Sequence, residues 1–536
     1  MPGSRERADD RSAWLQESSI SGVVTDWITG EPLSKVQVLA ERSDGRRPLA
    51  ATTTDSKGSF SLVHLQPGEY RLKGVRNGYI ETYYGARRAD SKGITLTLGP
   101  GIEPKNLQLK LLPFAVVAGT VRDPDGEPLA EARLALIAIT YRNGMRELRA
   151  TGHYATTDDL GHYRILGVAP GRYYVRAGPP YDDARDLVDH SPKEARPPEI
   201  LIPTFHPAAR DADGARKIEI AAGDRFTGAD VTLLRSRLYR VRVRFEGPPG
   251  LSSGVSLNPR PELGDGFGPQ PAGDCKAGVC EFARVPSGPY LAVGSAASPK
   301  MTIDELFSNS SQTYASVPVD VTDADIDGVS IVISAGADIA GHITVADDDH
   351  PDRKQLRVRF VDADGASHDS RFSEDDSFSA RLSPGRYEVQ VYASGNLIAK
   401  SIRAEDIEVI QDGLTISHSG KLPLEIALSH DGATIEGVIQ SKDDQPVPGA
   451  IVVLIPETRM RSRHGLFQQT STDQFGRYHF GAVTPGDYKL FVWAEVETGI
   501  WFDPDFLKDV ESDGHSIAVT AKDHQAINLR LTSDPK

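Results

Sequence analysis

The chain has 536 residues, of which 39% are hydrophobic and 25% charged, and its formal net charge is −15. This length exceeds what a single hydrophobic core usually organises, so several domains are expected. The acidic balance, without any stripe rich in Lys or Arg, argues against a nucleic-acid partner, because a polyanion needs a basic face. No apolar run reaches the length of a transmembrane segment.

The first 17 residues, MPGSRERADDRSAWLQE, are predicted to be disordered. They contain no apolar core that would serve as a signal peptide. Taken literally, this favours a cytoplasmic protein, although a mature or mis-started chain is equally compatible.

The first predicted β-sandwich spans residues 18–112 and shows the elements from which the rest of the chain is built. It opens with the strand ISGVVTD, followed by GEPLSKVQVLA. The stretch from Asp55 to Gly58 predicts a tight turn in which Gly takes a positive φ. Apolar residues then alternate with a period of two, which indicates half-buried antiparallel strands. The next turn, Pro-Gly-Glu-Tyr, ends at Tyr70, whose ring is expected to be buried with its hydroxyl near water or backbone.

The same turn recurs along the whole chain, with the variant Pro-Ser-Gly-Pro-Tyr in the third repeat. It ends at five tyrosines, spaced 103, 117, 97 and 101 residues apart: Tyr70, Tyr173, Tyr290, Tyr387 and Tyr488. This spacing is close to the roughly 100 residues of an immunoglobulin-sized sandwich. The second and fifth repeats also keep the opening strand and the Asp turn, whereas the third and fourth lose the opening motif.

The predicted fold is therefore all-β: a tandem array of about five antiparallel β-sandwich domains of immunoglobulin size, each with roughly seven strands. The predicted domains are 18–112, 113–236, 237–335, 336–430 and 431–536, of which the third and fourth are divergent.

The third repeat holds the two cysteines of the chain, Cys275 and Cys280, in the stretch GDCKAGVCEF. They flank a tight turn between two short strands, where a disulfide across the hairpin is sterically allowed. Two buried free thiols are the alternative. A disulfide would favour an oxidising compartment.

The pattern G-x-V-x-D, G-x-P-[LV], T-D-x-x-G-x-[FY] and P-G-x-Y resembles the carboxypeptidase regulatory-like domain. That domain belongs to the transthyretin-like and Cna-B-like group of sandwiches, which is often classed with carbohydrate-binding-like folds. The resemblance is good in repeats one, two and five and weaker in three and four. It implies a seven-stranded sandwich of the prealbumin (Ig-like) type and tandem use in secreted or surface bacterial proteins. In carboxypeptidases this domain accompanies the catalytic domain without carrying the chemistry.

The sequence favours a protein without catalytic activity, cofactor or metal. It contains no His-x-x-Glu pair, no HExxH, no G-x-S-x-G, no P-loop and no dinucleotide fingerprint, and the sandwiches occupy its whole length. Asp323 to Gly328 begins like an EF-hand calcium loop, but position twelve would be Ser334. This segment and the acidic clusters at 347–349 and 374–376 are interpreted as solvated turns, with calcium binding as the alternative.

Aromatic residues gather in the connections after the Pro-Gly-x-Tyr strand of the three full repeats. They are the candidate ligand-binding residues: Tyr83, Tyr84, Phe205, Trp501 and Phe502. Such rings stack on sugars or anchor a partner loop. The favoured alternative is that they plug the end of a sandwich or pack against the next domain.

The predicted function is a non-catalytic structural, adhesive or ligand-presenting array of the bacterial cell envelope or exterior. The alternative is a carbohydrate-binding protein that uses the aromatic loops. The short junction Leu112-Pro113-Phe114 favours a semi-rigid rod, and the expected partner is a glycan or another envelope protein. The oligomeric state is open. The resemblance and the cysteine pair favour an extracytoplasmic location, whereas a cytoplasmic scaffold follows if the N-terminus is genuine.

Overall fold

The computed structural model describes residues 18–42, 50–99, 103–180, 199–260, 271–297, 312–346, 356–373 and 377–531. The segment 1–17, which is predicted to be disordered, lies outside these residues. So do the acidic clusters at 347–349 and 374–376. The described residues are nearly all β and form five sandwiches, each with its own hydrophobic core.

Sandwich 1 packs a three-stranded sheet against a sheet centred on β5. Its strands are β1 (Ser18–Asp26), β2 (Gln37–Arg42), β3 (Ala50–Thr53), β4 (Ser59–Leu65), β5 (Gly68–Val75), β6 (Thr82–Tyr83), β7 (Leu96–Leu98) and β8 (Leu107–Leu111). The sheet orders are β4-β1-β8 and β3-β2-β5-β6, and β7 also pairs with β5. Ile20, Leu72 and Leu109 meet in the core between the two sheets.

Sandwich 2 repeats this plan with a longer hairpin. Its strands are β9 (Ala115–Arg122), β10 (Arg133–Arg142), β11 (Met145–Thr156), β12 (His162–Val168), β13 (Gly171–Gly178), β14 (Glu199–Ile202), β15 (Thr204–Phe205), β16 (Ile218–Ile220), β17 (Arg225–Phe226) and β18 (Val231–Thr232). One sheet runs β12-β9-β17 and the other β11-β10-β13-β15. Strand β14 leaves the sandwich and pairs with the first strand of sandwich 3, so a sheet continues across this junction.

Sandwich 3 contains the cysteine hairpin. Its strands are β19 (Leu234–Glu246), β20 (Ser252–Pro259), β21 (Gly273–Lys276), β22 (Val279–Pro286), β23 (Gly288–Ala297), β24 (Gln312–Val321) and β25 (Ile326–Val332). The sheet orders are β14-β19-β22-β21, with β25 also paired to β19, and β20-β23-β24.

Sandwich 4 has the widest sheet of the described chain. Its strands are β26 (Ala337–Val345), β27 (Arg357–Asp362), β28 (Ser367–Asp369), β29 (Arg371–Phe372), β30 (Ser377–Leu382), β31 (Gly385–Tyr392), β32 (Ile398–Ala404), β33 (Ile407–Glu408), β34 (Leu414–Ile416) and β35 (Gly420–Ser429). The six-stranded sheet runs β29-β30-β26-β35-β32-β33, and the other runs β28-β27-β31-β34.

Sandwich 5 carries short helices in two of its connections. Its elements are β36 (Ala433–Gln440), β37 (Ile451–Pro456), η5 (Thr458–Met460), η6 (His464–Leu466), β38 (Gln468–Ser471), β39 (Arg477–Val483), β40 (Gly486–Trp493), η7 (Ile500–Phe502), α4 (Pro504–Val510), η8 (Glu511–Asp513), β41 (His515–Val519), β42 (His524–Ala526) and β43 (Leu529–Arg530). The sheets run β39-β36-β42, with β43 also paired to β36, and β38-β37-β40-β41. None of the helices in the part of the chain that the structure describes is long and apolar enough to cross a membrane.

One parallel pairing recurs in every sandwich, between the first strand and the closing strand or strands. The pairs are β1 with β8, β9 with β17 and β18, β19 with β25, β26 with β35, and β36 with β42 and β43. The other pairings are antiparallel, as predicted. Alternation of apolar residues indicates a strand but not its direction, so the parallel pair is not visible in the sequence.

The glycine of the opening strand allows the closing strand to lie this close. A Cβ on Gly22 would lie 2.2 Å from the carbonyl oxygen of Leu107, and a Cβ on Gly437 would lie 1.8 Å from that of Ile527. Any side chain here would therefore collide with the closing strand. The opening motif of the full repeats is explained by this contact.

The Asp turn forms as predicted. Asp55 Oδ1 accepts hydrogen bonds from the backbone N–H groups of Lys57 and Ser59, both at 2.8 Å. Asp158 and Asp473 accept the same pair of bonds in sandwiches 2 and 5. The turn therefore has one geometry in all three full repeats.

The five repeated tyrosines also share one geometry. Each hydroxyl donates a hydrogen bond of 2.7–3.0 Å to the carbonyl oxygen four residues earlier in the chain. The acceptors are Gln66, Ala169, Pro286, Ser383 and Thr484. The ring is buried in four sandwiches and only partly buried at Tyr173. The predicted burial of the ring, with the hydroxyl on backbone, is therefore confirmed in those four.

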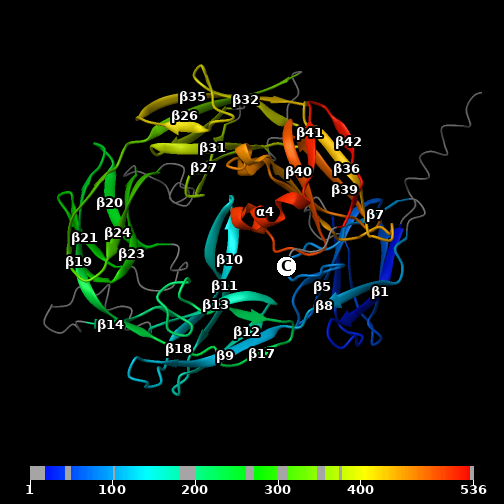
Figure 1. Cartoon of the computed structure of the whole chain (residues 1–536), viewed down its shortest axis with the longest axis horizontal. Coiled ribbons are helices and arrows are strands. Elements are labelled where there is room, and N and C mark those ends of the chain that lie inside the picture. Colours follow the sequence, from blue (N-terminus) through cyan, green and yellow to red (C-terminus); the bar gives the residue numbers. More distant parts are fainter. Residues whose placement is uncertain are drawn as a thin grey trace, which may run out of the picture.

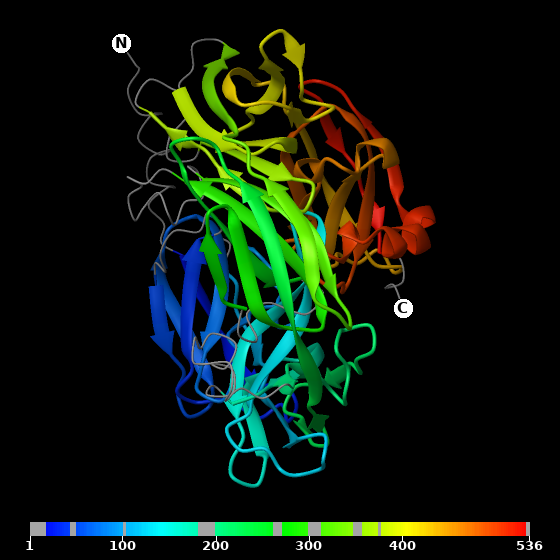
Figure 2. The same ribbon diagram turned by 90° about the vertical axis from the view of Figure 1, so that its left-hand side faces the viewer.

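The sandwiches are arranged in a closed ring rather than a rod (Figure 1). Sandwich 5 returns to sandwich 1, where the side-chain amide of Gln474 bonds both the N–H and the carbonyl of Thr97, each at 3.0 Å. Figure 2 shows that sandwiches 1 and 5 are displaced to opposite sides along the ring axis. The prediction of a semi-rigid rod is wrong, because the short junctions bend the array back on itself.

Candidate functional site

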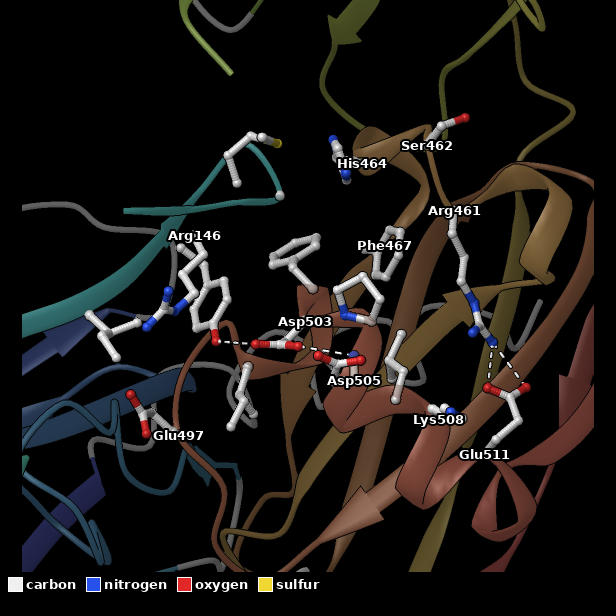
Figure 3. Close-up of a pocket in the computed structure, with 18 of the residues that line it drawn as sticks. Arg146, Arg461, Ser462, His464, Phe467, Glu497, Asp503, Asp505, Lys508 and Glu511 are labelled. Atoms are coloured by element: carbon white, nitrogen blue, oxygen red, sulfur yellow. Dashed lines mark hydrogen bonds and ion pairs between the residues drawn. The ribbon is translucent and has the colours of Figure 1, made fainter. Parts of the chain in front are cut away.

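The candidate site is a cavity of about 1190 Å³ between sandwiches 2 and 5. The β10–β11 hairpin and helix α4 lie in the middle of the ring (Figure 1). They form the two walls of the cavity. Figure 3 shows the side chains of both walls. The rings and aliphatic groups that line the cavity are Ile139, Tyr141, Met145, Tyr174, Phe467, Ile500, Phe502 and Leu507.

The wall from sandwich 2 is the outer face of the sheet that contains β10 and β13. Residues 134–137 of β10 are all buried, since one face meets the sandwich core and the other is covered. Behind the wall, Phe205 is completely buried and packs edge-on against Tyr174, with ring centroids 6.0 Å apart. Tyr174 is therefore held in place from behind while it lines the cavity.

The tip of the β10–β11 hairpin reaches two other sandwiches. Its turn is Asn143-Gly144, with φ of 47° and 78°, the Asn-Gly pair that favours a type I′ turn. Asn143 Nδ2 donates to the carbonyl oxygen of Gly365 in sandwich 4, at 2.8 Å. A Cβ on Gly144 would lie 2.1 Å from the His464 ring of sandwich 5. The hairpin is thus fixed at its tip.

The wall from sandwich 5 rests on a second apolar cluster outside the sandwich core. Trp501 is 4% exposed and packs in this cluster with Trp493, Leu507 and Val510. These contacts hold η7 and α4 against β37 and β40. Phe502, the next residue, lines the cavity and contacts Phe467, with ring centroids 4.8 Å apart.

Asp503 connects the two walls. Its Oδ1 accepts a hydrogen bond from the N–H of Asp505 at 3.0 Å and so caps α4, which begins at Pro504. Its Oδ2 accepts a hydrogen bond from the hydroxyl of Tyr141 at 3.1 Å. Burial and the Asp503 carboxylate raise the pKa of Tyr141, so its hydroxyl stays protonated as a donor across the physiological range.

Two ion pairs lie at the edges of the cavity. Arg172 Nη2 lies 2.6 Å from Glu497 Oε2 and joins sandwich 2 to sandwich 5. Arg461 Nη2 donates to both carboxylate oxygens of Glu511, at 3.0 and 2.8 Å. Burial would raise the pKa of Glu511, but its hydrogen bonds with Lys489 and Arg461 hold that pKa below its usual value.

His464 lies where sandwiches 2, 4 and 5 meet. Burial lowers the pKa of His464, and the Glu388 carboxylate of sandwich 4 opposes this only in part, so the imidazole is neutral at pH 7. The backbone N–H groups of His464 and Gly465 donate to Glu388 at 3.2 and 3.0 Å. This contact joins sandwiches 4 and 5.

The predicted aromatic residues do not form one row. Phe502 lines the cavity, whereas Phe205 and Trp501 lie behind its walls with no ring face free for a sugar. Tyr83 lies in sandwich 1, half-buried, and its hydroxyl donates to Glu41 Oε2 at 3.1 Å. Tyr84 packs against the core of the same sandwich. Stacking of a ligand on Phe205 or Trp501 is thus excluded by burial.

The other candidate residues of the sequence lie in sandwich 3. The structure joins Cys275 to Cys280 by a disulfide, with the Cα atoms 4.0 Å apart, across the β21–β22 hairpin. The carboxylates of Asp325 and Asp327 lie 3.4 and 3.1 Å from the Arg240 guanidinium. Two carboxylates of the segment from Asp323 to Gly328, which was compared with a calcium loop, are therefore paired with an arginine. Among the described residues, no group of three or more His, Cys, Asp or Glu side chains is placed to hold a metal ion.

The sequence reasoning missed the residues that face Phe502 across the cavity, Tyr141 and Arg146 above all. The sequence does show that two repeats have a longer connection at this place. The distance from the proline of the opening motif to the Asp turn is 23 residues in the first repeat (Pro32 to Asp55), but 30 in the second and 27 in the fifth. Those extra residues form the hairpin tip and the η5–η6 segment of the cavity.

Comparison with known proteins finds a family match in the first two repeats. Residues 19–109 and 116–191 match the family model of the carboxypeptidase regulatory-like domain. No curated protein matches the chain.

The chain is also similar to several solved structures. They include the Bacillus anthracis TIE protein, at 10% identity over 76% of this chain and 69% of that one, with a TM-score of 0.15. BcpA, the major pilin subunit of Bacillus cereus, is 9% identical over 96% of this chain and 99% of that one, with a TM-score of 0.14. The shaft pilin SpaA from Lactobacillus rhamnosus GG is 13% identical over 41% of this chain and 97% of that one, with a TM-score of 0.19. Whole molecules with such low TM-scores do not superpose.

The opening strand, the Asp turn and the tyrosine turn of sandwiches 1 and 2 lie within the two matched stretches. The chain therefore carries tandem carboxypeptidase regulatory-like domains, in residues 19–109 and 116–191.

Proposed function

We propose that this chain is a non-catalytic structural protein of the cell envelope or exterior, in which five sandwiches form one rigid body that presents its outer surfaces to another envelope protein. The observation that carries the proposal is that sandwich 5 bonds sandwiches 1, 2 and 4 at once. The contacts are Gln474 with Thr97, Asp503 with Tyr141, and the backbone of His464 with Glu388. Domains tied in this way keep fixed distances between their exposed loops, whereas separate domains on linkers move relative to one another.

The disulfide supports the location. Disulfides persist in oxidising compartments and are rare in the cytosol. The Cys275–Cys280 bridge closes a hairpin whose first strand, β21, is exposed along its whole length. A reducing compartment would have direct access to this part of the hairpin.

The experiment is thiol trapping in cells that produce the full chain. Cells are quenched with acid, fractionated, and treated with a polyethylene-glycol maleimide before and after reduction. We expect the chain in the envelope or external fraction, with a gel shift of two labels only after reduction. The Cys275→Ser/Cys280→Ser variant, which should never shift, shows that the labels report these residues. A cytoplasmic chain labelled twice without reduction would contradict the proposal.

A further inference from the structure

We infer that the cavity between sandwiches 2 and 5 binds an organic anion with an apolar body. This goes beyond the structural role proposed above, and either proposal can fail without the other. Three observations carry it: the charge at the mouth of the cavity, the rings inside it, and the support behind those rings.

Among the described residues, the lining of the cavity includes three exposed cations that form no ion pair with a carboxylate. Two of its basic groups are already paired, Arg172 with Glu497 and Arg461 with Glu511. Arg146, Lys217 and Lys508 are exposed lining residues from both walls, and among the described residues none of them forms an ion pair. The whole chain, in contrast, carries a net charge of −15.

The carboxylates of the lining do not cancel this surplus. Asp503 already accepts hydrogen bonds from Tyr141 and from the N–H of Asp505. These donors are neutral and leave the Asp503 carboxylate charged, so Asp503 and Asp505 are the remaining acids against the three cations, and the lining keeps a surplus of one positive charge. An anion at the mouth gains Coulomb attraction that a neutral molecule lacks, and this attraction grows where protein walls lower the effective dielectric constant.

The inside of the cavity suits an apolar body. Tyr141, Tyr174, Phe467 and Phe502 line it, and the ammonium of Lys217 lies 5.5 Å from the Tyr174 ring centroid. Ligand pockets typically measure about 300–1,000 Å³, so a cavity of about 1190 Å³ has room for an organic molecule.

The cavity is preformed, because buried residues hold its rings from behind. Phe205 supports Tyr174, and the cluster around Trp501 supports the segment that carries Phe502. A site whose walls are already ordered loses little conformational entropy when a ligand enters. The ligand class is therefore an amphiphilic anion, with its charge near the lining cations Arg146, Lys217 and Lys508 of the two walls and its apolar part against the rings.

The test uses two fluorescent probes with the same aromatic body. 8-Anilinonaphthalene-1-sulfonate carries a sulfonate, and N-phenyl-1-naphthylamine is its neutral counterpart. We expect the folded full chain to bind the sulfonate at one site, more tightly than the amine, and to lose this preference as salt screens the charges. Failure of the folded chain to bind the sulfonate, or equal affinity for both probes, would overturn the inference.

Variants separate the charge from the rings. Arg146→Gln/Lys217→Gln/Lys508→Gln should weaken sulfonate binding by about tenfold or more and leave the amine almost unchanged. Phe502→Ala should weaken both probes. The control Arg164→Gln/Lys421→Gln removes two exposed cations that do not line the cavity and should change neither affinity. Thermal unfolding of each variant confirms folding, and an unchanged sulfonate affinity in the folded triple variant contradicts the proposed site.

Discussion

At the scale of single residues, a buried threonine joins the two motifs that define a full repeat. Thr472 is fully buried; its hydroxyl donates to the carbonyl of Val447 at 2.7 Å and accepts from the N–H of Ala450 at 2.9 Å. Thr54 and Thr157 make the same two bonds in sandwiches 1 and 2. The residue before the Asp turn thus holds the loop that follows the opening strand.

Replacement of this threonine by valine tests the role of its hydroxyl. Thr472→Val keeps the shape but leaves a buried carbonyl and a buried N–H unpaired, so we expect a loss of about 2–4 kcal/mol in the free energy of unfolding of sandwich 5. Thr472→Ser keeps both bonds and should lose about 1 kcal/mol. Trp493 and Trp501 both lie in this sandwich, so urea titration followed by tryptophan fluorescence measures its free energy of unfolding. Equal losses for the two variants would show that the hydroxyl is not what matters.

The repeated tyrosines predict a pH dependence at the alkaline end. Burial raises the pKa of Tyr387 and of Tyr488 to about 12, above the usual tyrosine value of about 10. Because the folded pKa is above the unfolded one, their contribution to stability is complete below pH 10 and is lost as pH rises toward 12. We expect the free energy of unfolding to fall by up to about 2–3 kcal/mol per tyrosine across this window.

Thermal unfolding between pH 9 and pH 12 measures this fall. Tyr387→Phe/Tyr488→Phe should begin with a lower melting temperature, because two hydrogen bonds are lost, and should then show a shallower decline. A decline as steep as that of the unchanged chain would mean that these two phenols do not titrate as described.

At the scale of elements, the strands and turns were largely predictable, whereas the cavity was not. The turns at Asp55 and Tyr70 follow from local chemistry that the sequence shows directly. The contact of Tyr141 with Asp503 joins residues 362 positions apart. A single hydroxyl and a single carboxylate form no periodic pattern in the sequence. Their contact depends on how the sandwiches are arranged and could therefore not be predicted from the sequence.

One signal at this scale was readable. Strand β10 reads RLALIAITYR and strand β37 reads IVVLIP, continuous apolar runs rather than clean alternation. Such runs are typical of strands buried on both faces. They indicate that the outer face of each of these two sheets is covered. The two walls of the cavity lie on these outer faces. The burial of Phe205 and Trp501 follows from the same coverage.

The edge strand β7 gives a local test of ring closure. The N–H of Thr97 points away from β5 and is bonded by the side chain of Gln474. Gln474→Ala removes both bonds of this side chain, so we expect the amide of Thr97 to exchange with solvent roughly tenfold faster. Hydrogen–deuterium exchange of residues 96–98 measures it, with Gln469→Ala, an exposed residue of β38 in the same sandwich, as the control. Unchanged exchange in Gln474→Ala would mean that sandwiches 1 and 5 do not meet there in solution.

At the scale of the whole molecule, the sequence predicts how many sandwiches there are but not how they are placed. The short junction at Leu112-Pro113-Phe114 suggested a rod, because short linkers restrict motion. A short linker fixes an angle as readily as a straight line, however, and its direction depends on contacts far along the chain. The residue boundaries of the five domains stay a prediction, whereas the five separate cores are seen directly.

Small-angle X-ray scattering of the full chain tests the closed ring most directly. A compact chain of 536 residues has a radius of gyration of about 24 Å, and the ring should lie slightly above this, at about 25–30 Å. Five sandwiches of about 30 Å placed end to end would give a rod with a radius of gyration of roughly 43 Å. A value of about 25–30 Å agrees with closure of sandwich 5 on sandwich 1, and a value near that of the rod contradicts it.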